Sequence, residues 1–154
     1  MSAQSNPNAV ARIAQYAASL TFDDLTELAV TRARQVVLDT LGTMLGGYQT
    51  RLGQLAADYA AKMHAGDEAK HLGMDDSHRT AGHVAAELVP VALALGEHLH
   101  LTGQQLITAL AAGYDVFAAI QPHVSRWQRE RGLDHKGQAG TLASAVTAAV
   151  AMGL

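Results

Sequence analysis

Hydrophobic residues recur at intervals of three and four along most of the chain, a period typical of amphipathic α-helices. The first such stretch is ARIAQYAASL, residues 11–20, and we expect Asn8 or Pro7 to open its helix. The narrow apolar face of this helix consists of Val10, Ile13, Ala14 and Ala17. The pattern therefore predicts a first helix close to the N-terminus.

Two more helices are predicted before the middle of the chain. Thr21 and Asp24 have the spacing of a capping box, and Gly46 and Gly47 are expected to end the helix that the box begins. Its predicted apolar stripe is Leu25, Leu28, Ala29, Ala33, Val36, Val37, Leu41 and Met44. A third helix over 52–63 is expected to turn inward the side chains of Leu55, Ala56, Tyr59, Ala60 and Met63.

The second half of the chain predicts three further helices. The first covers 83–101 and continues past Pro90. The second covers 103–120 and is apolar over most of its circumference, so we expect it at the centre of the fold and ended by Pro122. The last covers 139–152 and is built from Ala, Val, Thr and Gly, which permit two helices to approach closely.

No alternating hydrophobic run and no Asn-Gly hairpin turn indicates a strand. We therefore predict an all-α fold, a compact bundle of about six helices. At 154 residues the chain is long enough for one independently folding domain, 1–154, in which we expect residues 1–7 to be flexible.

Composition narrows the classes of partner. The formal net charge is −3, and the eleven Lys and Arg residues are scattered, so we expect no nucleic-acid partner. Every long apolar stretch is broken by polar residues too soon for a membrane span. The chain contains no cysteine, and its first residues lack the pattern of a signal peptide, so we expect a cytoplasmic protein.

Two polar interruptions contain most of the residues suited to chemistry. The first, 64–82 with the adjoining His83, contains His71, Asp75, Asp76, Ser77, His78 and His83. The second, 121–138, contains His123, Arg126, Trp127, Arg129, Arg131, Asp134, His135 and Lys136. Loops between buried helices can present binding groups without disturbing the packing. If both interruptions lie at one end of the bundle, they form one pocket.

Four segments resemble the MmgE/PrpD family, which includes 2-methylcitrate dehydratase and cis-aconitate decarboxylase. Residues 13–47 are similar to its N-terminal helices and keep the sequence LDTLG at 38–42. The segment LGMDDSHRTAGHVAAELVPVALALGE resembles the family's LDFDDTH…GHPSA…VPAALALAE. AAGYDVFAAI is similar to the family's AGYEV helix, and LDHKGQAGTLASAVTAAVAMGL resembles HPTGTFGAFGAAAAAARLLGL. The order and approximate spacing agree across nearly the whole chain.

The resemblance implies both a fold and a chemistry. Family members have a large helical domain and a smaller α/β domain, with the active site between them, and act on small carboxylic acids without an obligatory organic cofactor. Their Asp, Thr and His in the LDFDD loop correspond to Gly73, Ser77 and His83, and a further histidine corresponds to His135. Gly73 therefore removes one carboxylate that could orient a substrate.

Two departures from the family pattern qualify the expected activity. The connection between Met63 and His71 is shorter than in the family, and the sequence ends at Leu154, before the rest of the helical domain and the small domain. Three interpretations stay open: a compact descendant with its own chemistry, a subunit that a second chain completes, or a helical remnant that binds without catalysis.

Two histidines and an aspartate are the predicted catalytic residues. His83 and His135 are expected to take and return protons, because imidazole titrates at about pH 6.5. Asp76 is expected to orient a histidine or the substrate. A purely structural role is the alternative for His83 and for the aspartates. His83 would then form a hydrogen bond at a helix N-terminus, and Asp75 or Asp76 would cap the following helix.

The predicted substrate-binding residues are Ser77, His78, Asp75, Arg126, Lys136 and Tyr114. The guanidinium fork of Arg126 matches a carboxylate in geometry, and either Arg126 or Lys136 is expected to neutralise charge that develops in the transition state. The alternatives are a solvated helix face for the Arg-rich run and a core position for the aromatic residue.

We expect neither a metal nor an organic cofactor. His71, Asp75, Asp76, His78 and His83 fall within 13 residues and are donors that suit Zn, Fe or Mn. No fixed metal-ligand spacing accompanies them, however, and the resemblance implies no required metal.

The predicted function is a lyase or isomerase that transfers protons through histidine on a small carboxylic acid or natural-product intermediate. The alternative is a non-catalytic helical subunit or small-molecule-binding module that completes or regulates a partner enzyme. We expect a homodimer, for which Gly137, Gly140 and Gly153 of the last helix offer a close-packing face. A second chain that supplies the missing domain remains possible as a partner.

Overall fold

The structure, a computed structural model, describes residues 8–63, 84–131 and 135–154. In these ranges the chain forms α1 (Ala9–Ser19), the short 3₁₀ helix η1 (Phe22–Asp24), α2 (Glu27–Tyr48), α3 (Arg51–Met63), α4 (Ala85–His98), α5 (Gly103–Glu130) and α6 (His135–Met152). None of the described residues forms a strand. The all-α prediction, with about six helices, is confirmed.

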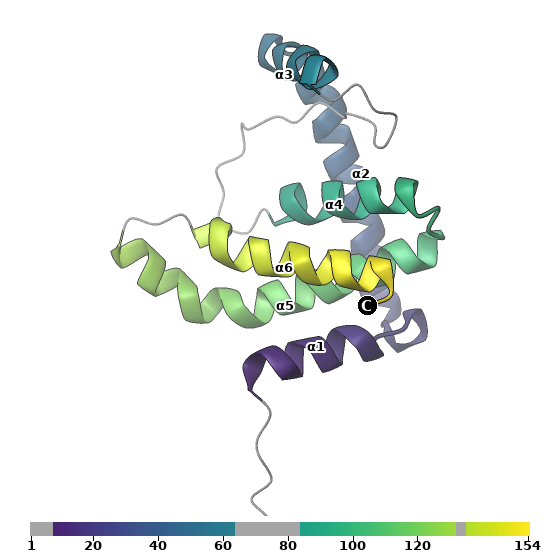
Figure 1. Cartoon of the computed structure of the whole chain (residues 1–154), viewed down its shortest axis with the longest axis vertical. Helices are drawn as coiled ribbons and strands as arrows, with labels where there is room; N and C mark the ends of the chain where they lie inside the picture. Colours follow the sequence, from purple (N-terminus) through teal and green to yellow (C-terminus); the bar gives the residue numbers. More distant parts are fainter. Residues whose placement is uncertain (1–7, 64–83, 132–134) are drawn as a thin grey trace, which may run out of the picture.

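The core lies between α4, α5 and α6, which pack side by side in Figure 1. Leu88 of α4, Leu110 of α5 and Ala143 of α6 are completely buried there. The central position predicted for α5 is confirmed, since this helix contacts α1, η1, α2, α4 and α6. An apolar surface that covers most of a helix needs neighbours on several sides.

Small residues bring α5 and α6 close together. A Cβ atom added to Gly113 would lie 2.0 Å from Thr147 Oγ1 and 3.1 Å from the Ala143 carbonyl oxygen. Thr147 itself is completely buried. The close helix approach predicted from the small residues of the last helix therefore occurs inside the fold, between α6 and α5.

A second, smaller core joins α1 to the opposite side of α5 and α6. Ala17 of α1 packs with Ala112 and Val116 of α5 and with Val146 of α6. Asn8 is the N-cap of α1, and its side chain accepts a hydrogen bond from the Ala11 N–H at 2.8 Å. The predicted first helix and its N-cap are confirmed.

The capping box of Thr21 and Asp24 is present, but it does not begin the long helix. It caps the start of η1, with the Thr21 N–H donating to Asp24 Oδ2 at 2.9 Å. The backbone at Leu25 is extended, so the helical turn cannot continue. Helix α2 starts at Glu27, and Thr26 is its N-cap.

Pro122 does not end α5, contrary to the prediction, because the helix runs to Glu130. A proline inside a helix removes one hydrogen bond and frees the carbonyl four residues earlier, here that of Ala118. Both residues are exposed, so water can hydrate the freed carbonyl group. The segment after Pro122 is thus largely helical and not a loop.

Two side chains of α3, those of Leu55 and Tyr59, do not turn inward, which corrects the prediction for these two residues. Leu55 is 56% exposed and Tyr59 is 65% exposed. Among the described elements α3 contacts only α2, and it lies at the end of α2 that is remote from α6 (Figure 1). The side chains of the other predicted residues, Ala56, Ala60 and Met63, lie outside the part of the chain that the structure describes.

Along α2 the predicted stripe is partly confirmed. Ala33 and Met44 are buried, and Val36 and Val37 pack against the main core. Leu28, however, is 66% exposed.

Among the described residues, no helix is both long enough and apolar enough to cross a membrane.

Candidate functional site

The N-terminal ends of α4 and α6 lie next to each other. Val84, the N-cap residue of α4, is 2% exposed, and Ala139 in the second turn of α6 is 1% exposed. Both residues belong to the same core cluster. Figure 1 shows that α4 and α6 begin on the same side of the molecule, where α5 ends. We call this region the α4–α6 junction.

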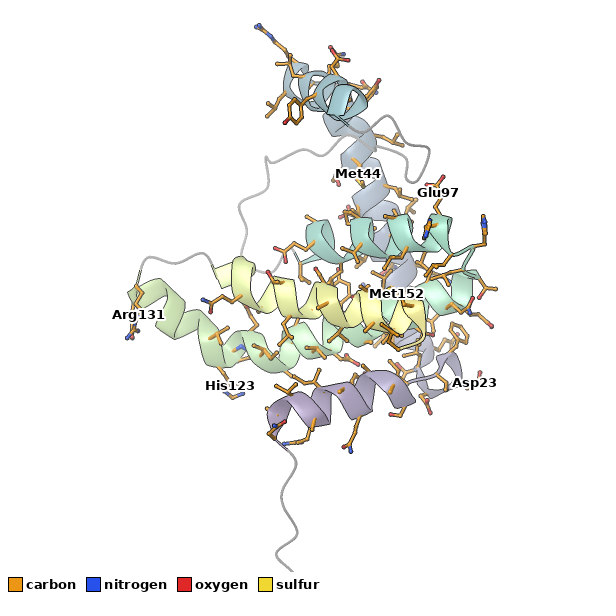
Figure 2. The ribbon with its side chains drawn as sticks, viewed as in Figure 1. Asp23, Met44, Glu97, His123, Arg131 and Met152 are labelled. Atoms are coloured by element: carbon orange, nitrogen blue, oxygen red, sulfur yellow. The ribbon has the colours of Figure 1, made fainter. Side chains whose placement is uncertain are left out.

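Arg131 lies on the same side. Figure 2 shows this residue at the end of α5, on the side of the molecule where α4 and α6 begin. The charged end of α5 therefore lies on the same side of the molecule as the N-termini of α4 and α6. Helix N-termini carry partial positive charge, which favours an anionic group nearby.

Glu87 is a residue of the junction that the sequence patterns did not single out. It lies in the first turn of α4, and its carboxyl group approaches Gly140 of α6. A Cβ atom added to Gly140 would lie 1.4 Å from Glu87 Oε2, so the carboxyl group occupies the space of an absent side chain. The available signals were an acidic residue in a first turn and a glycine inside a small-residue helix. Neither signal alone shows that the two residues meet.

Tyr114 is the predicted site residue whose side chain the structure describes. It is half-buried in α5 and packs against the main core cluster, as the structural alternative anticipated. Burial raises the pKa of its phenol to about 12. At neutral pH the phenol is therefore protonated, and it can donate a hydrogen bond but cannot serve as a base.

The other predicted site residues are described by backbone alone or lie outside the described residues. Arg126 belongs to α5, whereas His135 and Lys136 form the start of α6, four residues before the predicted beginning of that helix at Ala139. The remaining candidates lie outside the described residues: Asp75, Asp76, Ser77, His78 and His83. The catalytic and substrate-binding assignments therefore remain predictions.

The described residues include several His, Asp and Glu side chains that are potential metal ligands. Among them no group of three or more His, Asp or Glu side chains is arranged to hold a metal ion. The donor cluster from His71 to His83 lies outside the described residues.

The fold and the junction define the chain as an all-α protein whose helices α4 and α6 present their N-termini together. The chain belongs to the MmgE/PrpD family, since the family model of the MmgE/PrpD N-terminal domain matches residues 11–76 and 69–154. The two matched segments overlap at 69–76. No curated protein and no solved structure matches the chain.

Proposed function

We propose that the chain carries the acid–base part of a lyase or isomerase active site for a small carboxylic acid. The observation that supports this proposal is the α4–α6 junction, where the N-termini of two helices meet. Membership of the MmgE/PrpD family favours lyase-type chemistry.

Two histidines would transfer the proton in this mechanism. His83 directly precedes Val84, and consecutive Cα atoms are about 3.8 Å apart. His135 is the first residue of α6, about one turn before Ala139. Since Val84 and Ala139 share one core cluster, the junction makes it feasible for both imidazoles to reach a common substrate. One would remove a proton next to the carboxylate, and the other would return a proton.

The charged groups around this region suit an anionic substrate. In the proposed mechanism Arg126 or Lys136 neutralises the negative charge that develops in the transition state, and Ser77, His78 and Asp76 bind and orient the acid. The partial positive charge at the starts of α4 and α6 acts in the same direction. Glu87 is a carboxylate at the same junction and is suited to orienting an imidazole.

Deuterium exchange tests the proposal before the product is known. The chain is incubated in heavy water with a panel of small di- and tricarboxylic acids, and exchange at carbon next to a carboxylate is followed by proton NMR. We expect catalysed exchange that His83→Gln and His135→Gln each lower by at least about 100-fold, the range of a lost acid–base group. His98→Gln changes an exposed histidine at the far end of α4 and serves as the control. Exchange that survives both test substitutions contradicts the proposed mechanism.

The exposed apolar face of α2 and α3 favours a second candidate function, that of a helical subunit. Its large apolar side chains are at least 49% exposed: Leu38, Leu45, Tyr48, Leu52, Leu55 and Tyr59. We refer to them as the α2–α3 face. Large exposed apolar side chains that recur along two contacting helices favour a protein–protein interface there.

We propose that a second copy of the chain covers the α2–α3 face. The last helix was the expected dimer surface, but its Gly140 is buried against Glu87 and is therefore not available. Light scattering of the purified chain tests this proposal. We expect a dimer, and a monomer at every concentration would contradict it. A complex formed only with a different chain would instead support a hetero-oligomer.

A further inference from the structure

A groove of about 690 Å³ runs between α1 and α5, away from the α4–α6 junction. The two helices are antiparallel: Tyr16, late in α1, pairs with Asp115 in the middle of α5, while Ala9 and His123 line the other end. Figure 2 shows His123 on the side of α5 near the start of α1. Ile13, Val116 and Ile120 form an apolar wall between the two ends.

One end of the groove has a fixed hydrogen-bond acceptor. The Tyr16 hydroxyl donates to Asp115 Oδ2. Burial, followed by the hydrogen bond and the charge of Asp115, raises the pKa of this phenol well above its usual value, so its proton stays on the tyrosine. The bond from Tyr16 uses one position on Asp115 Oδ2, and a carboxylate has further acceptor positions, so Asp115 is able to accept a second hydrogen bond.

The other end of the groove carries cationic and N–H groups. Arg12 lies one helical turn before Tyr16, and His123 lies eight residues beyond Asp115, about 12 Å along the helix axis. Both side chains line the groove, and neither forms a hydrogen bond or ion pair with another described residue. A guanidinium and an imidazole N–H can together hold a carboxylate.

We propose that the α1–α5 groove binds a carboxylic acid whose carbon chain carries a hydroxyl group remote from the carboxylate. The carboxylate lies between Arg12 and His123, the carbon chain covers Ile13, Val116 and Ile120, and the hydroxyl donates to Asp115. A ligand with anionic groups at both ends would be repelled by Asp115, and a wholly apolar ligand would leave the polar groups at both ends without partners. This site is distinct from the proposed proton-transfer site and does not depend on it.

Amide NMR titration with three eight-carbon probes tests the site on the unmodified chain. The probes are ω-hydroxyoctanoate, octanoate, which lacks the hydroxyl, and octanol, which lacks the carboxylate. We expect ω-hydroxyoctanoate to shift amide signals of 9–16 and 115–123 with a Kd on the order of 1 mM, and each of the other probes to bind about fivefold more weakly. Equal binding of all three, or shifts scattered over other helices, would overturn the proposal.

Matched arginine substitutions test the charged end. Arg12→Gln is expected to weaken binding of ω-hydroxyoctanoate about fivefold, the upper range for an exposed ion pair. Arg32→Gln removes an equally exposed arginine on α2 that does not line the groove, and binding should not change. Equal affinities of the two variants would overturn the assignment of Arg12. Because the binding assay needs no turnover, its failure would leave the deuterium-exchange result unaffected.

Discussion

The carboxyl group of Glu87 in α4 fills the space beside Gly140 in α6 that any larger residue would need. The two residues are 53 positions apart in the sequence, yet they join the N-terminal ends of two helices. Glycine lowers intrinsic helix stability by about 1 kcal/mol relative to alanine. Helix formation therefore does not favour glycine at position 140, whereas the space taken by the Glu87 carboxyl group does.

The contact between Glu87 and Gly140 can be measured by a double-mutant cycle. Gly140→Ala alone is expected to change the free energy of unfolding by less than about 1 kcal/mol, because the glutamate side chain can move and alanine favours the helix. In a Glu87→Ala background the same substitution meets no carboxyl group and should stabilise the fold. We expect a coupling of about 1 kcal/mol by urea denaturation. Additive effects would show that the two residues are not in contact.

Gly113→Ala is expected to be much more damaging. The new Cβ would meet Thr147 Oγ1 at 2.0 Å and the Ala143 carbonyl oxygen at 3.1 Å, and the backbone of α6 has little freedom to move. We expect a loss of about 2 kcal/mol in the free energy of unfolding, the usual range for overpacking. Thr147→Ala in the same chain removes the nearest atom and should recover part of the loss.

Gly42→Ala is the control for this prediction. Gly42 lies inside α2, and a Cβ there would meet nothing within 4 Å. This substitution should stabilise the chain by about 0.5–1 kcal/mol through helix propensity. Similar effects of Gly42→Ala and Gly113→Ala would contradict the close approach of α5 and α6.

Because the phenol of Tyr114 is buried, we expect the fold to lose stability at high pH. Burial raises its pKa in the folded state to about 12, above the usual value for tyrosine, so the folded state holds this proton to higher pH than the unfolded state. The stabilisation is fully present below pH 10 and is lost as pH rises from about 10 to about 12. Tyr16, whose pKa is also raised, contributes in the same direction.

Tyr114→Phe should therefore reduce the dependence of stability on pH in this range. The measurement is the urea midpoint as a function of pH, together with tyrosinate absorbance of the folded chain. Tyr59→Phe, at a side chain that is 65% exposed in the single chain, is the matched control and, measured at dilutions where the chain is monomeric, should leave the dependence as it is. An identical pH profile for Tyr114→Phe and the unmodified chain would show that burial of this phenol has no such effect.

Charged substitutions on the α2–α3 face should separate assembly from folding. Leu55→Asp lies in α3 and is expected to weaken the proposed dimer by at least about tenfold, because a buried unpaired charge at an interface is costly. The helical content should stay unchanged, since Leu55 is already 56% exposed in the single chain. Gln54→Asp, at an exposed polar position of the same helix, is the control. A dimer that Leu55→Asp leaves intact would exclude this face as the interface.

Much of the secondary structure could be predicted because its causes are local. The spacing of apolar residues indicated all six helices, and the side chain of Asn8 capped the first as expected. The central position of α5 followed from its nearly continuous apolar surface. Local patterns were insufficient where one motif is compatible with two structures. The capping box at Thr21 can begin a long helix or a single 3₁₀ turn, and here it begins the 3₁₀ turn. Pro122 can end a helix or lie within one, and here it lies on an exposed side of α5 that tolerates it.

The order of the residues predicted that the chain is helical, which helices are amphipathic, and which two polar segments are candidates for a site. Which surfaces meet followed from the packing of the helices: Glu87 lies against Gly140, Tyr16 pairs with Asp115, and Leu55 and Tyr59 of α3 stay exposed. The physical reason is that helix periodicity arises from neighbours three and four residues apart, whereas these contacts join residues separated by dozens of positions. An amphipathic pattern shows that a face needs a partner, but the partner's identity depends on how distant helices pack.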